Sequence, residues 1–129
     1  NVSSNDMNSL VISIGSNSHN RECQIYSCVN WLHSILNIRM ISEVYNTQAT
    51  NGIDADYLNM VVIADCNDEL DIILEKFKNY EAISGRTLQS KIIGVIPIDL
   101  DIVIWNNNII REKDFNQKYF QIGWHQLNK

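Results

Sequence analysis

The sequence is poor in proline, glycine and cysteine. It holds one proline, five glycines and three cysteines among 129 residues. Collagen-like, proline-rich and disulfide-stapled architectures are therefore excluded. The cysteines are odd in number and form no Cys-x-x-Cys pair, so we predict that Cys23, Cys28 and Cys66 are reduced, partly buried thiols of a cytoplasmic protein.

Positive charge and long apolar runs are also scarce. Ten lysines and arginines face 15 acidic residues, which gives a net charge of −5 at pH 7. This balance argues against nucleic acid or an anionic membrane as a partner. No apolar run approaches the roughly 18 residues that cross a bilayer, and no basic-then-apolar leader is visible. An anionic ligand would have to be held by cations placed locally.

The apolar pattern predicts a regular series of strands and helices. Hydrophobic residues make up 45% of the chain, as in an ordinary globular domain. Apolar runs predict strands at 10–14, 38–45, 57–64 and 97–104, and helical stripes predict helices at 21–36 and 68–84. Residues 86–96 are predicted to be a connection, and the tail from residue 106 adds a short strand and a helix. Residues 1–8 are polar and patternless, which favours a frayed lead or a cloning remnant before a single domain over residues 9–129.

The order β-α-β-β-α-β predicts an α+β fold of the ferredoxin-like type. In that fold an antiparallel four-stranded sheet carries two helices on one face. Right-handed crossovers place the first and third strands at the centre of the sheet and the other two at its edges. The fold hosts many functions and decides none of them.

Asp99 and Asp101 lie one residue apart within the last apolar run. Side chains at i and i+2 of a strand leave the same face, so both carboxylates project together. Two like charges near a core are costly unless a cation or hydrogen-bond donors offset them. Mg²⁺ suits such a pair because it binds one or two carboxylates and completes its octahedron with waters and phosphate oxygens. Alternatively, the strand ends here and both aspartates face water.

Five segments resemble, in the same order, motifs of the 6-hydroxymethyl-7,8-dihydropterin pyrophosphokinase (HPPK) family. They are residues 12–17 (Ile-Ser-Ile-Gly-Ser-Asn), 44–47 (Val-Tyr-Asn-Thr), 56–59 (Asp-Tyr-Leu-Asn), 81–86 (ending Gly-Arg) and 98–102 (Ile-Asp-Leu-Asp-Ile). Enzymes of that family transfer pyrophosphate from ATP to a hydroxymethylpterin in folate biosynthesis. The resemblance implies ATP and a pterin as partners and two Mg²⁺ ions as cofactors, in a monomer or a homodimer.

The resemblance also implies roles for individual residues. Asp99 and Asp101 would bind the two Mg²⁺ ions, and with Arg86 they would form the catalytic group. Glu81, Arg86 and Lys91 would bind the nucleotide, and Thr47, Tyr57 and Asn59 would bind the pterin. Each role has a structural alternative. Tyr57 would pack under the sheet, Asn59 would satisfy a backbone group at an edge, and Arg86 would be a solvated partner of a helix end.

The chain departs from the family in the stretch before the aspartates. Where the family has arginines and a tryptophan that close over ATP, this sequence has Leu88, Ile92, Ile93 and Ile96, and Lys91 is the one cation of residues 87–96. These apolar residues favour packing, for instance against a partner subunit, over a polar lid. Three hypotheses follow: an active minimal pyrophosphokinase, a pterin-binding module without ATP chemistry, or a ferredoxin-like interaction domain that dimerises through an exposed sheet.

Overall fold

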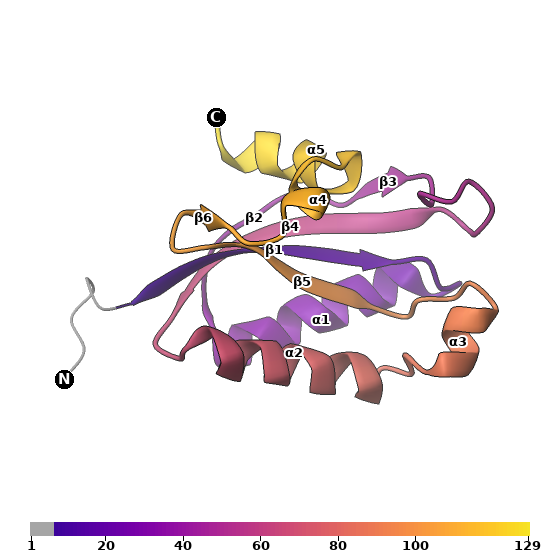
Figure 1. Ribbon diagram of the computed structural model, residues 1–129, viewed down its shortest axis with the longest axis horizontal. Coiled ribbons are helices and arrows are strands. Elements are labelled where there is room, and N and C mark those ends of the chain that lie inside the picture. Colours follow the sequence, from indigo (N-terminus) through magenta and orange to yellow (C-terminus); the bar gives the residue numbers. More distant parts are fainter. Residues whose placement is uncertain (1–6) are drawn as a thin grey trace.

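The computed structural model describes residues 7–129 and confirms the α+β ferredoxin-like arrangement (Figure 1). The elements are β1 (Asn8–Ser16), α1 (Arg21–Ile35), β2 (Asn37–Ile41), β3 (Tyr45–Thr47), β4 (Tyr57–Cys66), α2 (Leu70–Ile83), α3 (Leu88–Ile92), β5 (Asp99–Trp105), β6 (Asn108–Ile109), α4 (Glu112–Phe115) and α5 (Lys118–Leu127). Of the lead predicted at residues 1–8, residues 1–6 lie outside the described part and Asn8 already belongs to β1. None of the helices described is long and apolar enough to span a membrane.

The sheet runs in the order β2-β4-β1-β5-β6, and β3 also pairs with β4. As predicted, the first and third long strands, β1 and β4, lie inside the sheet, and the strands pair antiparallel. The prediction that the aspartate strand lies at an edge is wrong, because the chain turns back after β5 and β6 pairs with its end. Gly15 of β1 lies between Asn59 of β4 and Asp99 of β5, and Ser13 lies opposite Asp101. The register therefore brings residues from three distant segments to one end of one sheet face.

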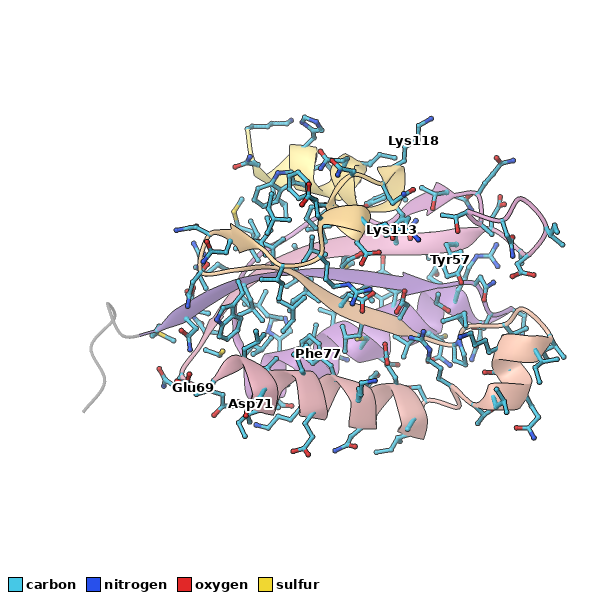
Figure 2. The ribbon with its side chains drawn as sticks, viewed as in Figure 1. Tyr57, Glu69, Asp71, Phe77, Lys113 and Lys118 are labelled. Atoms are coloured by element: carbon cyan, nitrogen blue, oxygen red, sulfur yellow. The ribbon has the colours of Figure 1, made fainter. Side chains whose placement is uncertain are left out.

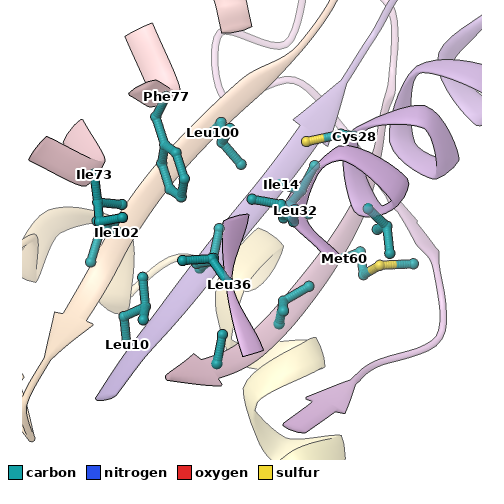
Figure 3. Close-up of a cluster of buried hydrophobic side chains, with 14 of the residues drawn as sticks. Leu10, Ile14, Cys28, Leu32, Leu36, Met60, Ile73, Phe77, Leu100 and Ile102 are labelled. Atoms are coloured by element: carbon teal, nitrogen blue, oxygen red, sulfur yellow. The ribbon is translucent and has the colours of Figure 1, made fainter. Parts of the chain in front are cut away.

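One face of the sheet is covered by α1 and α2 (Figure 1). Even-numbered residues of β1 (Leu10, Ile12 and Ile14) point to these helices and join the larger buried cluster. Phe77 of α2 extends from its helix toward β5 and packs in this cluster with Leu100 (Figure 3). Because strand side chains alternate, the odd-numbered residues, including Asp99 and Asp101, belong to the opposite face.

The second face is partly covered by α5, which the sequence did not lead us to expect there. Phe120 is fully buried in a smaller cluster with Val11, Val61 and Val103. Gly123 allows the helix to approach closely, since a Cβ there would lie 2.5 Å from Val61 Cγ2. The tail helix lies on the side of the sheet away from α1 and α2 (Figure 1). The interaction-domain hypothesis required this face to be exposed, and over this cluster it is not.

Two local predictions differ from the structure. The strand predicted at 38–45 is divided into β2 and β3, because Ser42 accepts the Val61 backbone N–H on its hydroxyl (2.9 Å) and interrupts the ladder. The connection at 86–96 contains α3, which is capped reciprocally by Thr87 and Ser90. Three apolar residues of this segment do not pack in the chain: Leu88, Ile92 and Ile93 are 71%, 74% and 73% exposed, whereas Ile96 is partly buried. Of the three free cysteines, Cys28 and Cys66 are buried and Cys23 is exposed.

Candidate functional site

Two cavities meet at Asp99. The larger has a volume of about 610 Å³ and lies over the ends of β1, β3 and β4, beneath the tail segment 110–119. The smaller, of about 440 Å³, lies between α2 and β5. Both are lined by Asp99, Arg111 and Asp114. Two ligands bound in the two cavities would therefore contact the same carboxylate.

The larger cavity contains all three residues predicted to bind a pterin: Thr47, Tyr57 and Asn59. Asn59 is 2% exposed, and its amide donates to the Tyr45 carbonyl (3.1 Å) and to the Thr47 hydroxyl (2.8 Å). The structural alternative for Asn59, a bond to strand backbone, is thus present, and it fixes the side chain at the cavity wall. The carbonyl oxygen of the amide faces Gly15, where an added Cβ would lie 3.3 Å away.

Tyr57 is half-buried at the same wall and does not pack in the core below the sheet. Figure 2 shows it on the upper side of the sheet, away from Phe77. Burial raises the pKa of its hydroxyl, and the negative charge of Asp99 raises it further, while Arg86 opposes both. The neutral ring and hydroxyl therefore offer a flat apolar surface with one polar end to whatever occupies the cavity.

Arg86 is fixed at the mouth of the smaller cavity by two carboxylates. Its Nη1 donates to Glu81 Oε2 (2.8 Å) and to Asp99 Oδ1 (2.9 Å), and it also reaches the Ile98 carbonyl (3.3 Å). Gly85, with φ of +100°, lets the chain reverse after α2 so that Arg86 returns to β5. Arg86 is therefore a bridge between α2 and β5, and the solvated helix-end alternative is wrong.

Glu81 is held from two sides. Besides Arg86, its Oε2 accepts the Leu100 backbone N–H at 2.8 Å. Burial raises the pKa of this carboxyl, whereas the Leu100 N–H and Arg86 partly offset the effect. The bond to Leu100 ties the end of α2 to the strand that carries the acid pair, so Glu81 sets the position of Arg86.

The acid pair lies at the start of β5, and its two carboxylates are only partly exposed. The side chains of Asp99 and Asp101 are 39% and 22% exposed, and Arg111 Nε lies 3.8 Å from Asp101 Oδ1. Burial, followed by the charge of Asp99, raises the pKa of Asp101 to about 8, although Arg111 opposes the rise. The Asp101 carboxyl therefore keeps its proton to a higher pH than a free aspartate does, because burial and a neighbouring negative charge both disfavour its ionised form.

Comparison with protein families matches residues 11–129, nearly the whole chain, to 7,8-dihydro-6-hydroxymethylpterin-pyrophosphokinase. The chain belongs to the HPPK family. Membership implies pyrophosphokinase activity in folate biosynthesis, and the family uses ATP with Mg²⁺. A search of curated proteins found no match to the chain.

The donor set of this HPPK-family site fits Mg²⁺. Two carboxylates on one strand face are hard oxygen ligands, and a divalent cation relieves the repulsion that otherwise retains a proton. Within residues 7–129 no group of three or more His, Cys, Asp or Glu side chains is arranged to hold a metal. Asp99 and Asp101 would therefore supply the protein ligands, and waters and phosphate oxygens would take the other positions.

Lys91 is the predicted site residue that the structure leaves apart. It lies on the exposed surface of α3 and lines neither cavity. The three cations that do line the smaller cavity are Lys78, Arg86 and Arg111. The smaller cavity is thus built by α2, β5 and the tail, rather than by residues 87–96.

Sequence reasoning did not place the tail residues Arg111, Asp114 and Tyr119 in the site. Arg111 Nε donates to Asp114 Oδ2 at 2.5 Å, and the Tyr119 hydroxyl donates to Asp114 Oδ1. The run of charged residues at 111–114 is evident in the sequence. Its position over the acid pair depends on the return of the chain through β6 and α4, which no local pattern encodes.

Asn17 joins the two loops that border the site. It is 3% exposed; its side-chain oxygen accepts the Ile96 N–H at 2.6 Å, and its amide donates to the Gly94 carbonyl at 2.8 Å. The same amide reaches the Ala55 carbonyl at 3.5 Å. The predicted Gly-Ser-Asn turn is in fact the end of β1 and the residue after it. Asn17 is a structural tie between residues 54–56 and 94–96, and Gly15 lines the larger cavity.

Proposed function

We propose that this HPPK-family chain transfers pyrophosphate from ATP to 6-hydroxymethyl-7,8-dihydropterin in a Mg²⁺-dependent reaction. The observation that carries the proposal is the shared wall of the two cavities. Asp99 borders both, so an acceptor hydroxyl in the larger cavity and a triphosphate in the smaller one meet at the acid pair. The free cysteines support a reducing, cytoplasmic setting.

The larger cavity supplies recognition of a flat heterocycle. Tyr57 provides a ring surface, and the fixed amide of Asn59 and the hydroxyl of Thr47 provide polar groups at its edge. A bicyclic pterin carries amide-like donors and acceptors on one edge and its hydroxymethyl group on the other. Bound with its amide edge at Asn59, the ring would direct the hydroxymethyl group toward Asp99.

The smaller cavity supplies positioning of the phosphates. Arg86 is held rigidly by Glu81 and Asp99, and a planar guanidinium matches phosphate oxygens. Bound Mg²⁺ would neutralise phosphate charge at Asp99 and Asp101, which is the main chemical requirement of phosphoryl-type transfer. The acceptor oxygen forms a bond to the β-phosphorus, the bond from that phosphorus to the α–β bridging oxygen breaks, AMP leaves, and the hydroxyl proton passes to water.

AMP formation tests the proposal directly. Purified protein with saturating pterin, ATP and Mg²⁺ should release AMP and form the pterin pyrophosphate, and chelation of Mg²⁺ should stop both. Asp99→Asn removes a charge shared by both cavities and should lower kcat at least 100-fold. Asp68→Asn is the matched control, because Asp68 is an ion-paired aspartate on another part of the surface, bound to Lys76 at 3.2 Å. Absence of AMP above background in the wild-type protein would reject the proposal.

The second candidate is a pterin-binding module without ATP chemistry. It is favoured by the exposed isoleucines of residues 92–93 and by the position of Lys91 outside both cavities. In that case the pterin would raise the thermal midpoint of the protein, whereas Mg²⁺ with a non-hydrolysable ATP analogue would not. Stabilisation by both ligands would decide for the pyrophosphokinase.

A further inference from the structure

Arg111 differs from every other cation near the acid pair in lining both cavities. Lys113 lines the larger one only, whereas Lys78 and Arg86 line the smaller one only. Among the described residues, Arg111 is thus the single positive side chain present at both sides of the junction at Asp99. Any phosphate group that passes from one ligand to the other would pass beside it.

The segment that carries Arg111 is fastened to β5 by backbone hydrogen bonds. Asn106 and Asn107, with φ of 48° and 68°, form the tight turn that returns the chain along β5. The backbone N–H groups of Ile110 and Arg111 both donate to the Val103 carbonyl, at 2.9 and 3.3 Å. The side chain is then held by Asp114.

Asp114 is in turn held by the C-terminal helix. The Tyr119 hydroxyl donates to its other carboxylate oxygen, and the Tyr45 hydroxyl donates to the Tyr119 carbonyl at 2.6 Å. Tyr119 precedes the fully buried Phe120. The orientation of Arg111 is therefore anchored through three side chains to β3 and to the core.

The ion pairs of Arg111 occupy only one edge of its guanidinium. Among the described residues, its contacts with Asp114 (2.5 Å) and Asp101 (3.8 Å) both run through Nε, so the two Nη groups remain for an anion. Half of the Arg111 side chain (49%) is exposed toward the cavities and solvent. A triphosphate carries up to four negative charges, and residues 87–96 bring no cation to the cavity walls.

We propose that Arg111 binds the ATP phosphates where the two cavities meet, with Asp114 as its positioning residue. The inference rests on the proposed function and names a residue through which this chain compensates for the cations missing from residues 87–96. Asp114 fixes the guanidinium so that its free N–H groups face the junction. A charge-assisted contact of this kind contributes about 10- to 100-fold in affinity.

Calorimetry with Mg²⁺ and a non-hydrolysable ATP analogue tests the proposal without requiring turnover. Arg111→Ala should weaken analogue binding about 10- to 100-fold and leave the affinity for the pterin within about threefold. Arg111→Lys keeps the charge but loses the planar fork, so it should recover part of the loss. Asp114→Asn should raise the KM for ATP more than it lowers kcat, because it acts through the orientation of Arg111.

Arg39→Ala is the matched control. Arg39 lies on β2, at the opposite edge of the sheet, and its side chain is nearly as exposed (47%) as that of Arg111. Its Nε forms an ion pair with Asp65 at 2.9 Å. Its removal should change analogue binding less than twofold. Circular dichroism and the thermal midpoint establish that each variant is folded, and Arg111→Gln replaces Arg111→Ala if the latter unfolds.

The possible outcomes separate this inference from the proposed function. If the wild-type protein binds the analogue but releases no AMP, turnover is rejected and the Arg111 variants still decide the contact. If Arg111→Ala or Arg111→Gln, in folded form, binds the analogue as tightly as the wild type, the Arg111 contact is wrong while the pyrophosphokinase stands. A wild-type protein that binds no analogue overturns both.

Discussion

Replacing Asp101 by asparagine should make the protein more stable at alkaline pH while removing a predicted metal ligand. In the folded chain the Asp101 pKa is raised from 3.8 to about 8, chiefly by burial and then by Asp99. A carboxyl whose pKa is higher in the folded chain than in the unfolded chain contributes its full stabilisation only at a pH below its unfolded-chain pKa. The contribution is lost as the pH rises toward 8, because the unfolded chain releases the proton first. Asparagine has no such proton to lose.

The structure sets the size of the effect. A rise from 3.8 to about 8 corresponds to at most about 6 kcal/mol of the free energy of unfolding, at roughly 1.4 kcal/mol per pKa unit. Contact with solvent over 22% of the side chain, and loss of the long contact with Arg111, reduce the gain. We therefore expect Asp101→Asn to gain about 2 kcal/mol over the wild type at pH 8.5 relative to pH 4.

Urea denaturation at pH 4 and pH 8.5, with EDTA present, measures this difference. Asp68→Asn is the control, since Asp68 is 41% exposed and lies in a surface ion pair, and it should show less than 0.5 kcal/mol of pH-dependent gain. The expected gain should also disappear when Mg²⁺ and an ATP analogue replace EDTA, because the bound cation relieves the repulsion in the wild type. An unchanged pH dependence in Asp101→Asn would refute the assigned electrostatics of the acid pair.

Two further predictions concern the frame of the site. Gly123→Ala should lower the free energy of unfolding, measured in urea, by about 1–3 kcal/mol. The new methyl group would lie 2.5 Å from Val61 Cγ2 and 2.7 Å from the Tyr45 hydroxyl. A change below 0.5 kcal/mol would mean that α5 packs less closely than described. Asn17→Ala leaves the partly buried Ile96 N–H and Gly94 carbonyl without their side-chain partner, so we expect a loss of about 1–3 kcal/mol. Amide hydrogen exchange should then quicken at Ile96, and unchanged exchange there would contradict the role of Asn17 as a tie.

The sheet and the acid pair were predictable because their signals are local. Alternating or continuous apolar runs encode the strands, and the i, i+2 spacing places Asp99 and Asp101 on one face. The pairing of Gly15 with both Asn59 and Asp99 follows once the strand order is known. The matched family motifs then group the pterin-side residues, and the structure brings these into one cavity.

The position of the tail on the sheet could not be predicted equally well, because it depends on contacts between residues far apart in the sequence. The stripe of α5 indicates a helix but does not say which face of the sheet it covers. In the structure, the burial of Phe120 and the close approach at Gly123 place it against Val61. The position of Arg111 depends on the turn at Asn106 and Asn107, where two residues with positive φ reverse the strand. The short helix α3 escaped notice because five residues carry too little periodicity.

The burial of Phe120 has a consequence for biosynthesis. Translation proceeds from the N-terminus, so the strands and the two large helices leave the ribosome before residues 118–127. Until that segment emerges, Val11, Val61 and Val103 have no cover on their side of the nascent sheet. The nascent chain therefore exposes an apolar surface until residues 118–127 have been synthesised. A chain whose translation stalls before that point would be a substrate for chaperones.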